Sequence, residues 1–156
     1  MQARMDHPAF IVPDAMAALQ ALGKSVIVAL RNSEASPATH ELINLRASQI
    51  NGCSVCVEGH AKSLKEAGES DERIWAVGAW RESPHFSDAE RAALALTEET
   101  TRLADRAEPV SDEVWAEASK HFDEKTLAAI VLAIASINVW NRLNGATRQI
   151  AGATEW

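Results

Sequence analysis

The sequence predicts an all-α fold in one domain that spans residues 1–156. Two observations carry this prediction. Apolar residues recur at spacings of three and four along most of the chain, which is the period of an amphipathic helix, and no segment alternates as a half-buried strand does. Most of the periodic segments also begin with a serine or aspartate that can cap a helix. The content of 47% hydrophobic and 24% charged residues is typical of a globular domain with a sizeable core.

The first elements follow from turn and cap signals. We expect residues 1–12 to form an extended arm. Asp14 then opens a first helix that continues to about Leu30. The next helix is predicted to begin at Ser36, with its hydroxyl as N-cap and Pro37 at the first helical position.

A third helix is predicted over Ser54 to Ala67, with Gly68 as its terminator. The last helix runs to about Ile150, and it is apolar nearly all round between residues 127 and 137, which predicts that it is buried. The starts of the four helices after the third are predicted at capping residues: Ser70, Ser87, Ser111 and Asp123.

Charge and composition narrow the function classes. A net charge of −7 argues against nucleic acid and anionic membrane surfaces as partners. The most apolar run, residues 127–135, is far shorter than the roughly 20 residues that a membrane span needs. The N-terminus has no basic segment followed by an apolar one, so secretion is not expected. We therefore expect a cytoplasmic protein.

The chemistry is concentrated in the stretch from Glu41 to His60. Both cysteines of the protein, Cys53 and Cys56, lie here, and His60 follows four residues after the second. On a helix these three residues share one face. Cysteines at a helix N-terminus are stabilised as reactive thiolates, with pKa values below the free value of about 8.5. His60 can exchange a proton with Cys56, and Glu41 can orient the imidazole.

Two other interpretations of the cysteine pair stay open at this level. Buried cysteines often serve as small hydrophobic residues. Two thiolates, an imidazole and a carboxylate are also a feasible zinc ligand set, although structural zinc sites usually draw their ligands from two separated segments. A pair at redox spacing in a chain without further cysteines favours a dithiol redox site in a reducing compartment.

The pattern E-x11-C-x2-C-x3-H, with a Leu-Arg-Ala-Ser run and Asn51-Gly52 before the cysteines, resembles the carboxymuconolactone decarboxylase superfamily, specifically its AhpD-like alkylhydroperoxidase branch. The resemblance covers about residues 10–150. It implies a bundle of about six to seven helices that assembles into a homo-oligomer, commonly a trimer or hexamer.

The resemblance also implies a peroxidase that needs no cofactor or metal. Cys56 would attack the peroxide and become a sulfenic acid, and Cys53 would resolve it as a disulfide. His60 and Glu41 would form a relay that deprotonates Cys56. A dithiol reductant protein or a lipoyl-type carrier would restore the thiols.

One residue departs from the family pattern. Members often carry a histidine or aromatic residue immediately before the second cysteine, and this chain has Val55 there. A second imidazole beside the cysteines is therefore not expected, and this keeps a non-enzymatic redox sensor open as an alternative. A decarboxylase-like lyase, the other activity of the superfamily, is the second alternative, although that reaction needs no cysteine pair.

The remaining histidines are expected at the surface: His7, His40, His85 and His121. Three polar residues of the last helix are expected to bond neighbouring helix ends or a subunit contact: Asn138, Asn141 and Arg142.

Overall fold

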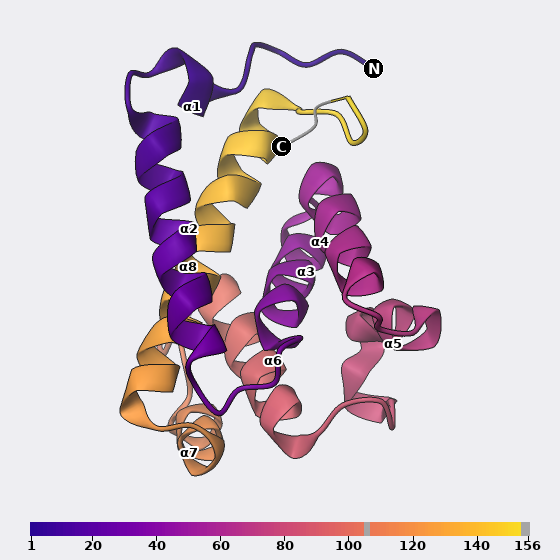
Figure 1. The fold of residues 1–156 in the computed structure, drawn as a ribbon, viewed down its shortest axis with the longest axis vertical. Helices are drawn as coiled ribbons and strands as arrows, with labels where there is room; N and C mark the ends of the chain where they lie inside the picture. Colours follow the sequence, from indigo (N-terminus) through magenta and orange to yellow (C-terminus); the bar gives the residue numbers. More distant parts are fainter. Residues whose placement is uncertain (105–106, 154–156) are drawn as a thin grey trace.

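The computed structural model describes residues 1–104 and 107–153, and it confirms the all-α prediction (Figure 1). Within these residues the chain forms helices and turns, with no strand. The helices are α1 (Pro8–Ile11), α2 (Ala15–Arg31), α3 (Thr39–Asn51), α4 (Ser54–Glu66), α5 (Asp71–Ala76), the 3-10 helix η1 (Val77–Glu82), α6 (Asp88–Thr101), α7 (Asp112–His121) and α8 (Glu124–Thr147).

Most predicted helix starts are confirmed by their caps. In each case the side chain of the capping residue accepts the backbone N–H three residues later, which satisfies a donor that the helix leaves unpaired. Ser87 and Glu90 form the complete reciprocal capping box at the start of α6. The other confirmed caps are Ser70, Ser111 and Asp123.

The expectation of an extended arm over residues 1–12 is wrong at its end, where α1 forms. His7 caps this short helix, because its Nδ1 accepts the N–H of Ala9 at 3.2 Å, and Pro8 occupies the first helical position. His7 is only 3% exposed and stacks on Trp140, so its predicted place at the surface is also wrong.

The start of α3 differs from the prediction as well. The helix begins at Thr39, and Ala38 is its N-cap. Ser36 does not cap the helix, because its hydroxyl donates to Glu90 Oε1 on α6 at 2.8 Å. A long-range hydrogen bond has here taken the side chain that local rules assign to the cap.

Helices α3 and α8 form the centre of the bundle. α2 and α6 pack against α8, and α4 and α6 pack against α3 (Figure 1). Ile130 and Ile134 of α8 are fully buried in one cluster with Val26 of α2 and Leu96 of α6. The predicted burial of α8 is thus confirmed over most of its apolar stretch, although Leu132 is exposed.

α8 also has the length and apolar composition of a membrane-spanning helix. More than half of its apolar stretch is buried against neighbouring helices of the bundle. Core helices of globular domains have the same composition, because they too are surrounded by apolar side chains.

A polar network joins the end of α3 to the middle of α8. The Asn51 amide donates to Asn138 Oδ1 at 2.9 Å and to Asn141 Oδ1 at 2.8 Å. The Asn141 amide donates to Ser48 Oγ at 3.0 Å, and Arg142 donates to Asn138 Oδ1 at 2.8 Å. The expectation that α8 asparagines bond a neighbouring helix end is confirmed. This network holds the α3–α4 turn, and with it the cysteines, against α8.

Candidate functional site

The two cysteines lie at the N-terminus of α4, immediately after the turn that ends α3. Gly52 makes this turn with φ +68°, a left-handed conformation that favours glycine. Cys53 is the N-cap of α4, and its sulfur accepts the Cys56 N–H at 3.3 Å. Cys53 and Cys56 form a disulfide with their Cα atoms 5.4 Å apart, and both residues are buried. The predicted helix, its cap and its Gly68 terminator are confirmed.

The structure also brings together the predicted imidazole and carboxylate. His60 lies one turn after Cys56 on α4, and Glu41 reaches it from α3. His60 Nδ1 lies 2.8 Å from Glu41 Oε2. Because a carboxylate can only accept, Nδ1 carries the proton, and Nε2 is the basic nitrogen of the neutral ring.

Glu41 also contacts a second imidazole, that of His40, and the sequence interpretation did not predict this contact. His40 Nδ1 lies 2.9 Å from Glu41 Oε1, and the Asn44 amide lies 3.2 Å from His40 Nε2. The placement of His40 at the surface, apart from Glu41, is therefore wrong. Sequence neighbours on a helix point apart, but the Glu41 side chain is long enough for its two oxygens to contact both rings.

Glu41 is an ionised carboxylate at the centre of this arrangement. Burial alone would raise the pKa of Glu41, but hydrogen bonds from His40 and His60 outweigh burial and lower the pKa to about 2. The group is thus an acceptor over the whole physiological range. It can hold both rings in one orientation and can stabilise positive charge on either ring.

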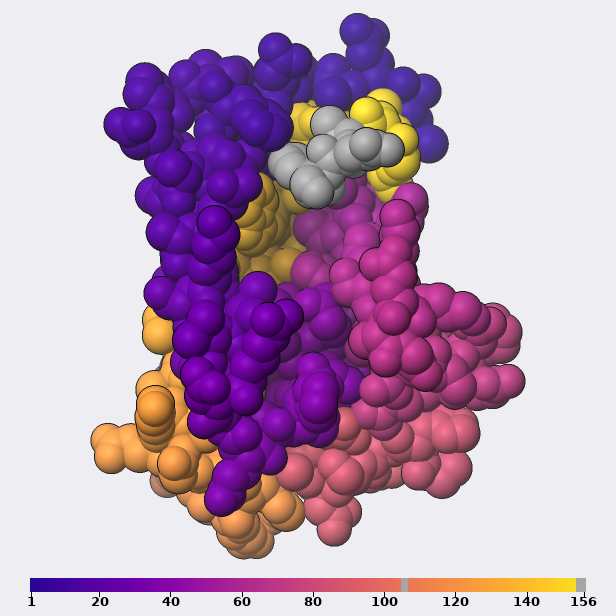
Figure 2. Space-filling model, in the orientation of Figure 1, coloured from indigo at the N-terminus to yellow at the C-terminus, as the bar shows by residue number. Residues whose placement is uncertain are grey.

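Cys56 and the two imidazoles line a pocket of about 740 Å³ between α2, α3, α4 and α8. Figure 2 shows this hollow between the indigo α2 and the magenta α4, with the yellow-orange α8 at its floor. Cys53 is not among the residues that line the pocket. The apolar part of the lining includes Val26, Val55, Ile137 and Trp140, and the polar part includes His40, Asn44, Cys56, His60 and Asn144.

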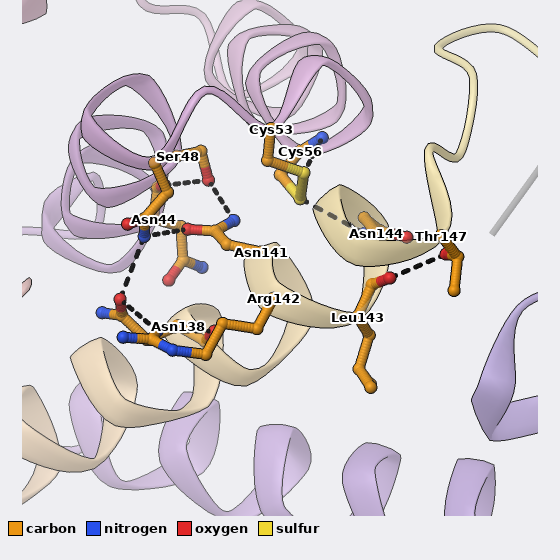
Figure 3. Close-up of a disulfide and its surroundings, with 11 residues drawn as sticks. Asn44, Ser48, Cys53, Cys56, Asn138, Asn141, Arg142, Leu143, Asn144 and Thr147 are labelled. Carbon is orange, nitrogen blue, oxygen red and sulfur yellow. Dashed lines mark hydrogen bonds between the residues drawn. A yellow bond between two sulfur atoms is a disulfide. The ribbon is translucent and has the colours of Figure 1, made fainter. Parts of the chain in front are cut away.

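Asn144 of α8 is the second residue that the sequence interpretation missed. Its Nδ2 donates to Cys56 Sγ at 3.3 Å, and the side chain is buried beside the disulfide (Figure 3). Asn138, Asn141 and Asn144 follow one another at spacings of three, so they continue one polar stripe along α8. This spacing could have predicted that Asn144 lies on the same buried face, but only Asn138, Asn141 and Arg142 were assigned to it.

Metal ligands are not grouped in the part of the chain that the structure describes. No cluster of three or more His, Cys, Asp and Glu side chains there is arranged to hold an ion. The donor set that suggested zinc is engaged otherwise: the two sulfurs bond each other, and Glu41 bonds the two imidazoles.

Comparison with known proteins shows the family of this chain. The carboxymuconolactone decarboxylase family model matches residues 13–99. The uncharacterized protein YdfG of Bacillus subtilis is 37% identical over 114 residues, which cover 73% of this chain and 76% of YdfG.

Several solved structures share the fold, and two of them illustrate the likeness. One is a protein of unknown function from Agrobacterium tumefaciens, proposed to be the antioxidant defence protein AhpD. It is 32% identical, with a TM-score of 0.86 over 98% of this chain and 100% of that chain. The other is the debrominase Bmp8, at 23% identity and a TM-score of 0.78, over 90% of this chain and 73% of that chain. This second likeness concerns the fold alone. The chain therefore has an AhpD-like all-α fold and belongs to the carboxymuconolactone decarboxylase family.

Proposed function

We propose that this protein is a thiol peroxidase that reduces hydrogen peroxide or organic hydroperoxides. The observation that carries the proposal is the position of Cys56. This cysteine is bonded to Cys53, lines a pocket that can admit a small molecule, and shares that pocket with an imidazole held by a carboxylate. A dithiol, a base and an access route are the parts that peroxide reduction requires.

The first chemical step belongs to Cys56. Its thiol passes a proton to Nε2 of His60, and the thiolate attacks one oxygen of the hydroperoxide. The S–O bond forms while the O–O bond breaks, and the alkoxide leaves as an alcohol with the proton from His60. Cys56 becomes a sulfenic acid. The assignment of Cys56 rather than Cys53 is supported by the pocket, which Cys56 lines and Cys53 does not.

The second step belongs to Cys53. Its sulfur attacks the sulfenic acid, a disulfide forms, and the hydroxyl of the sulfenic acid leaves as water. An external dithiol then reduces the disulfide by thiol–disulfide exchange and is itself oxidised. We propose a dithiol protein or a lipoyl-type carrier in the cytoplasm as this reductant.

Stopped-flow oxidation of the reduced protein by cumene hydroperoxide tests the proposal. We expect rapid formation of an intramolecular disulfide in the wild type. The Cys53→Ser variant should stop at a sulfenic acid on Cys56, which dimedone labels and mass spectrometry locates. The Cys56→Ser variant should react no faster than free cysteine at the same pH. If the wild-type thiols also react no faster than free cysteine, the peroxidase is refuted and a redox sensor or lyase takes its place.

We also propose that the protein assembles into a homo-oligomer, either a trimer or a hexamer. Apolar side chains are exposed on α2 and on the two helices that contact it, α1 and α8. Phe10 on α1 is 63% exposed, Val28 on α2 57% and Leu132 on α8 48%. Exposed apolar side chains support a subunit contact where they form one contiguous surface. Light scattering coupled to gel filtration measures the mass directly, and a mass of 16.9 kDa would refute assembly.

A further inference from the structure

The Cys56 sulfur receives a hydrogen bond from a helix that the His60–Glu41 pair does not involve. Asn144 lies in the last turn of α8, and its Nδ2 is 3.3 Å from Cys56 Sγ (Figure 3). The backbone around it is held, because the Asn144 carbonyl accepts the Gln149 N–H at 3.0 Å. Asn144 is only 5% exposed, so little water competes for this contact. The amide is therefore a buried donor aimed at one sulfur.

The two sulfurs differ in the donor that each receives. Cys53 Sγ accepts the Cys56 N–H, which is one of the unpaired donors at the start of α4. That backbone donor is thereby directed to Cys53, whereas Cys56 Sγ receives the Asn144 amide. A hydrogen bond to the charged form of a group favours that form, and more so where the local dielectric is low. Once the disulfide is reduced, Asn144 can stabilise a thiolate on Cys56.

The other end of the same amide is unsatisfied. Within the described residues, Asn144 Oδ1 is buried and has no hydrogen-bond partner. A buried acceptor without a donor destabilises the fold, so an acceptor at a pocket is a position where water or a ligand can supply the donor. Asn144 is one of the residues that line the pocket with Cys56. The groups that reach Cys56 in peroxide reduction, a hydroperoxide and then a sulfenic acid, each carry an O–H.

We propose that Asn144 is a further catalytic residue of this site. Its Nδ2 donates to the Cys56 thiolate, and its Oδ1 accepts the O–H of the hydroperoxide and later of the sulfenic acid. The second role depends on the proposed peroxidase, whereas the first concerns the thiolate alone. Asn144 would then assist the cysteine from the side of α8, while His60 takes its proton from the side of α4.

The donor role is tested without peroxide, in a Cys53→Ser parent that has one thiol. Pulse alkylation with iodoacetamide between about pH 5 and 10 gives the pH at which half of the thiol is ionised. This range includes the free-thiol pKa of about 8.5 and the lower values of activated thiols. We expect Asn144→Ala to raise the midpoint by about one pH unit. At pH values below the midpoint, this shift lowers the thiolate fraction about tenfold. Asn144→Leu, which keeps the branched side chain but has no N–H donor and no charge, should also raise the midpoint. It carries the test if the alanine variant does not fold.

Ser136→Ala is the control. Ser136 is a buried polar residue of α8 that lines the same pocket, and it does not belong to the network that holds the cysteines against α8. We expect this variant to keep the parent midpoint. If folded Asn144→Ala and Asn144→Leu also keep the parent midpoint, the donor role is refuted.

The acceptor role is tested at a pH well above each midpoint, where the thiolate is complete. There we expect cumene hydroperoxide to oxidise the Asn144→Ala variant about tenfold more slowly than the Cys53→Ser parent, since one hydrogen bond to the peroxide is lost. Equal rates refute this role. A parent that reacts no faster than free cysteine refutes the proposed function instead, and the alkylation result still decides the donor role.

Discussion

Glu98 offers a stability prediction that can be worked out from its contacts. This α6 carboxylate is 4% exposed. It accepts hydrogen bonds from Arg46 of α3 at 2.7 Å, from Trp80 of η1 at 2.9 Å and from Arg81 at 2.7 Å. Burial alone would raise the pKa of Glu98, but these donors outweigh burial and lower the pKa to about 2. Glu98 therefore links α6 to the helix that carries Glu41.

The magnitude follows from proton linkage. A carboxyl whose pKa falls from 4.5 to about 2 on folding contributes about 3 kcal/mol to the free energy of unfolding at pH 7. Because the folded pKa is the lower one, this contribution is complete above the unfolded value. It is lost as the pH falls from 4.5 toward 2, and about 1 kcal/mol remains at pH 3. The Glu98→Gln variant lacks the contribution at every pH.

Urea unfolding followed by circular dichroism measures the difference. We expect the wild type to exceed Glu98→Gln by about 3 kcal/mol at pH 7 and by about 1 kcal/mol at pH 3. Glu66→Gln is the control, since the Glu66 side chain is 67% exposed and its removal should change stability by less than about 0.5 kcal/mol. A gap between wild type and Glu98→Gln that stays the same from pH 7 to pH 3 would refute the linkage argument.

Three further predictions concern the site and its support. Glu41→Gln should slow peroxide oxidation of the thiols by about 10²-fold, because the carboxylate that orients His60 is lost. Glu58→Gln at the pocket wall is the control, and equal stopped-flow rates for the two variants would contradict the prediction. Gly52→Ala should lower the free energy of unfolding by about 1 kcal/mol, since φ is positive there, whereas Gly59→Ala inside α4 should raise it by about 0.5 kcal/mol or more. The two melting temperatures should move in opposite directions, and a shift in the same direction refutes the backbone argument. Asn141→Leu removes one hydrogen bond each from Ser48 and Asn51, which keep their bonds to Asn44 and Asn138, and should cost about 1–3 kcal/mol by urea unfolding. A loss below about 0.5 kcal/mol would show that water replaces both hydrogen bonds.

Local interactions explain why so much of the fold could be predicted. The caps at Ser70, Ser87, Ser111 and Asp123 bond a backbone N–H three residues away, so the sequence around each start contains the whole interaction. The cysteine spacing likewise predicts its own geometry, because residues three and four apart on a helix are neighbours. The same rules failed at Ser36, where Glu90, 54 residues away, takes the hydroxyl.

The sequence by itself determined the all-α class, the helix that carries Cys53 and Cys56, and the shared face of Cys56 and His60. Only the tertiary structure decided that Glu41 binds two imidazoles and that Asn144, 88 residues from Cys56, donates to its sulfur. The physical reason is the separation along the sequence between the residues that interact. A helix and its caps depend on residues within one turn, whereas the environment of a buried sulfur depends on which distant side chains the packing of α3, α4 and α8 places beside it.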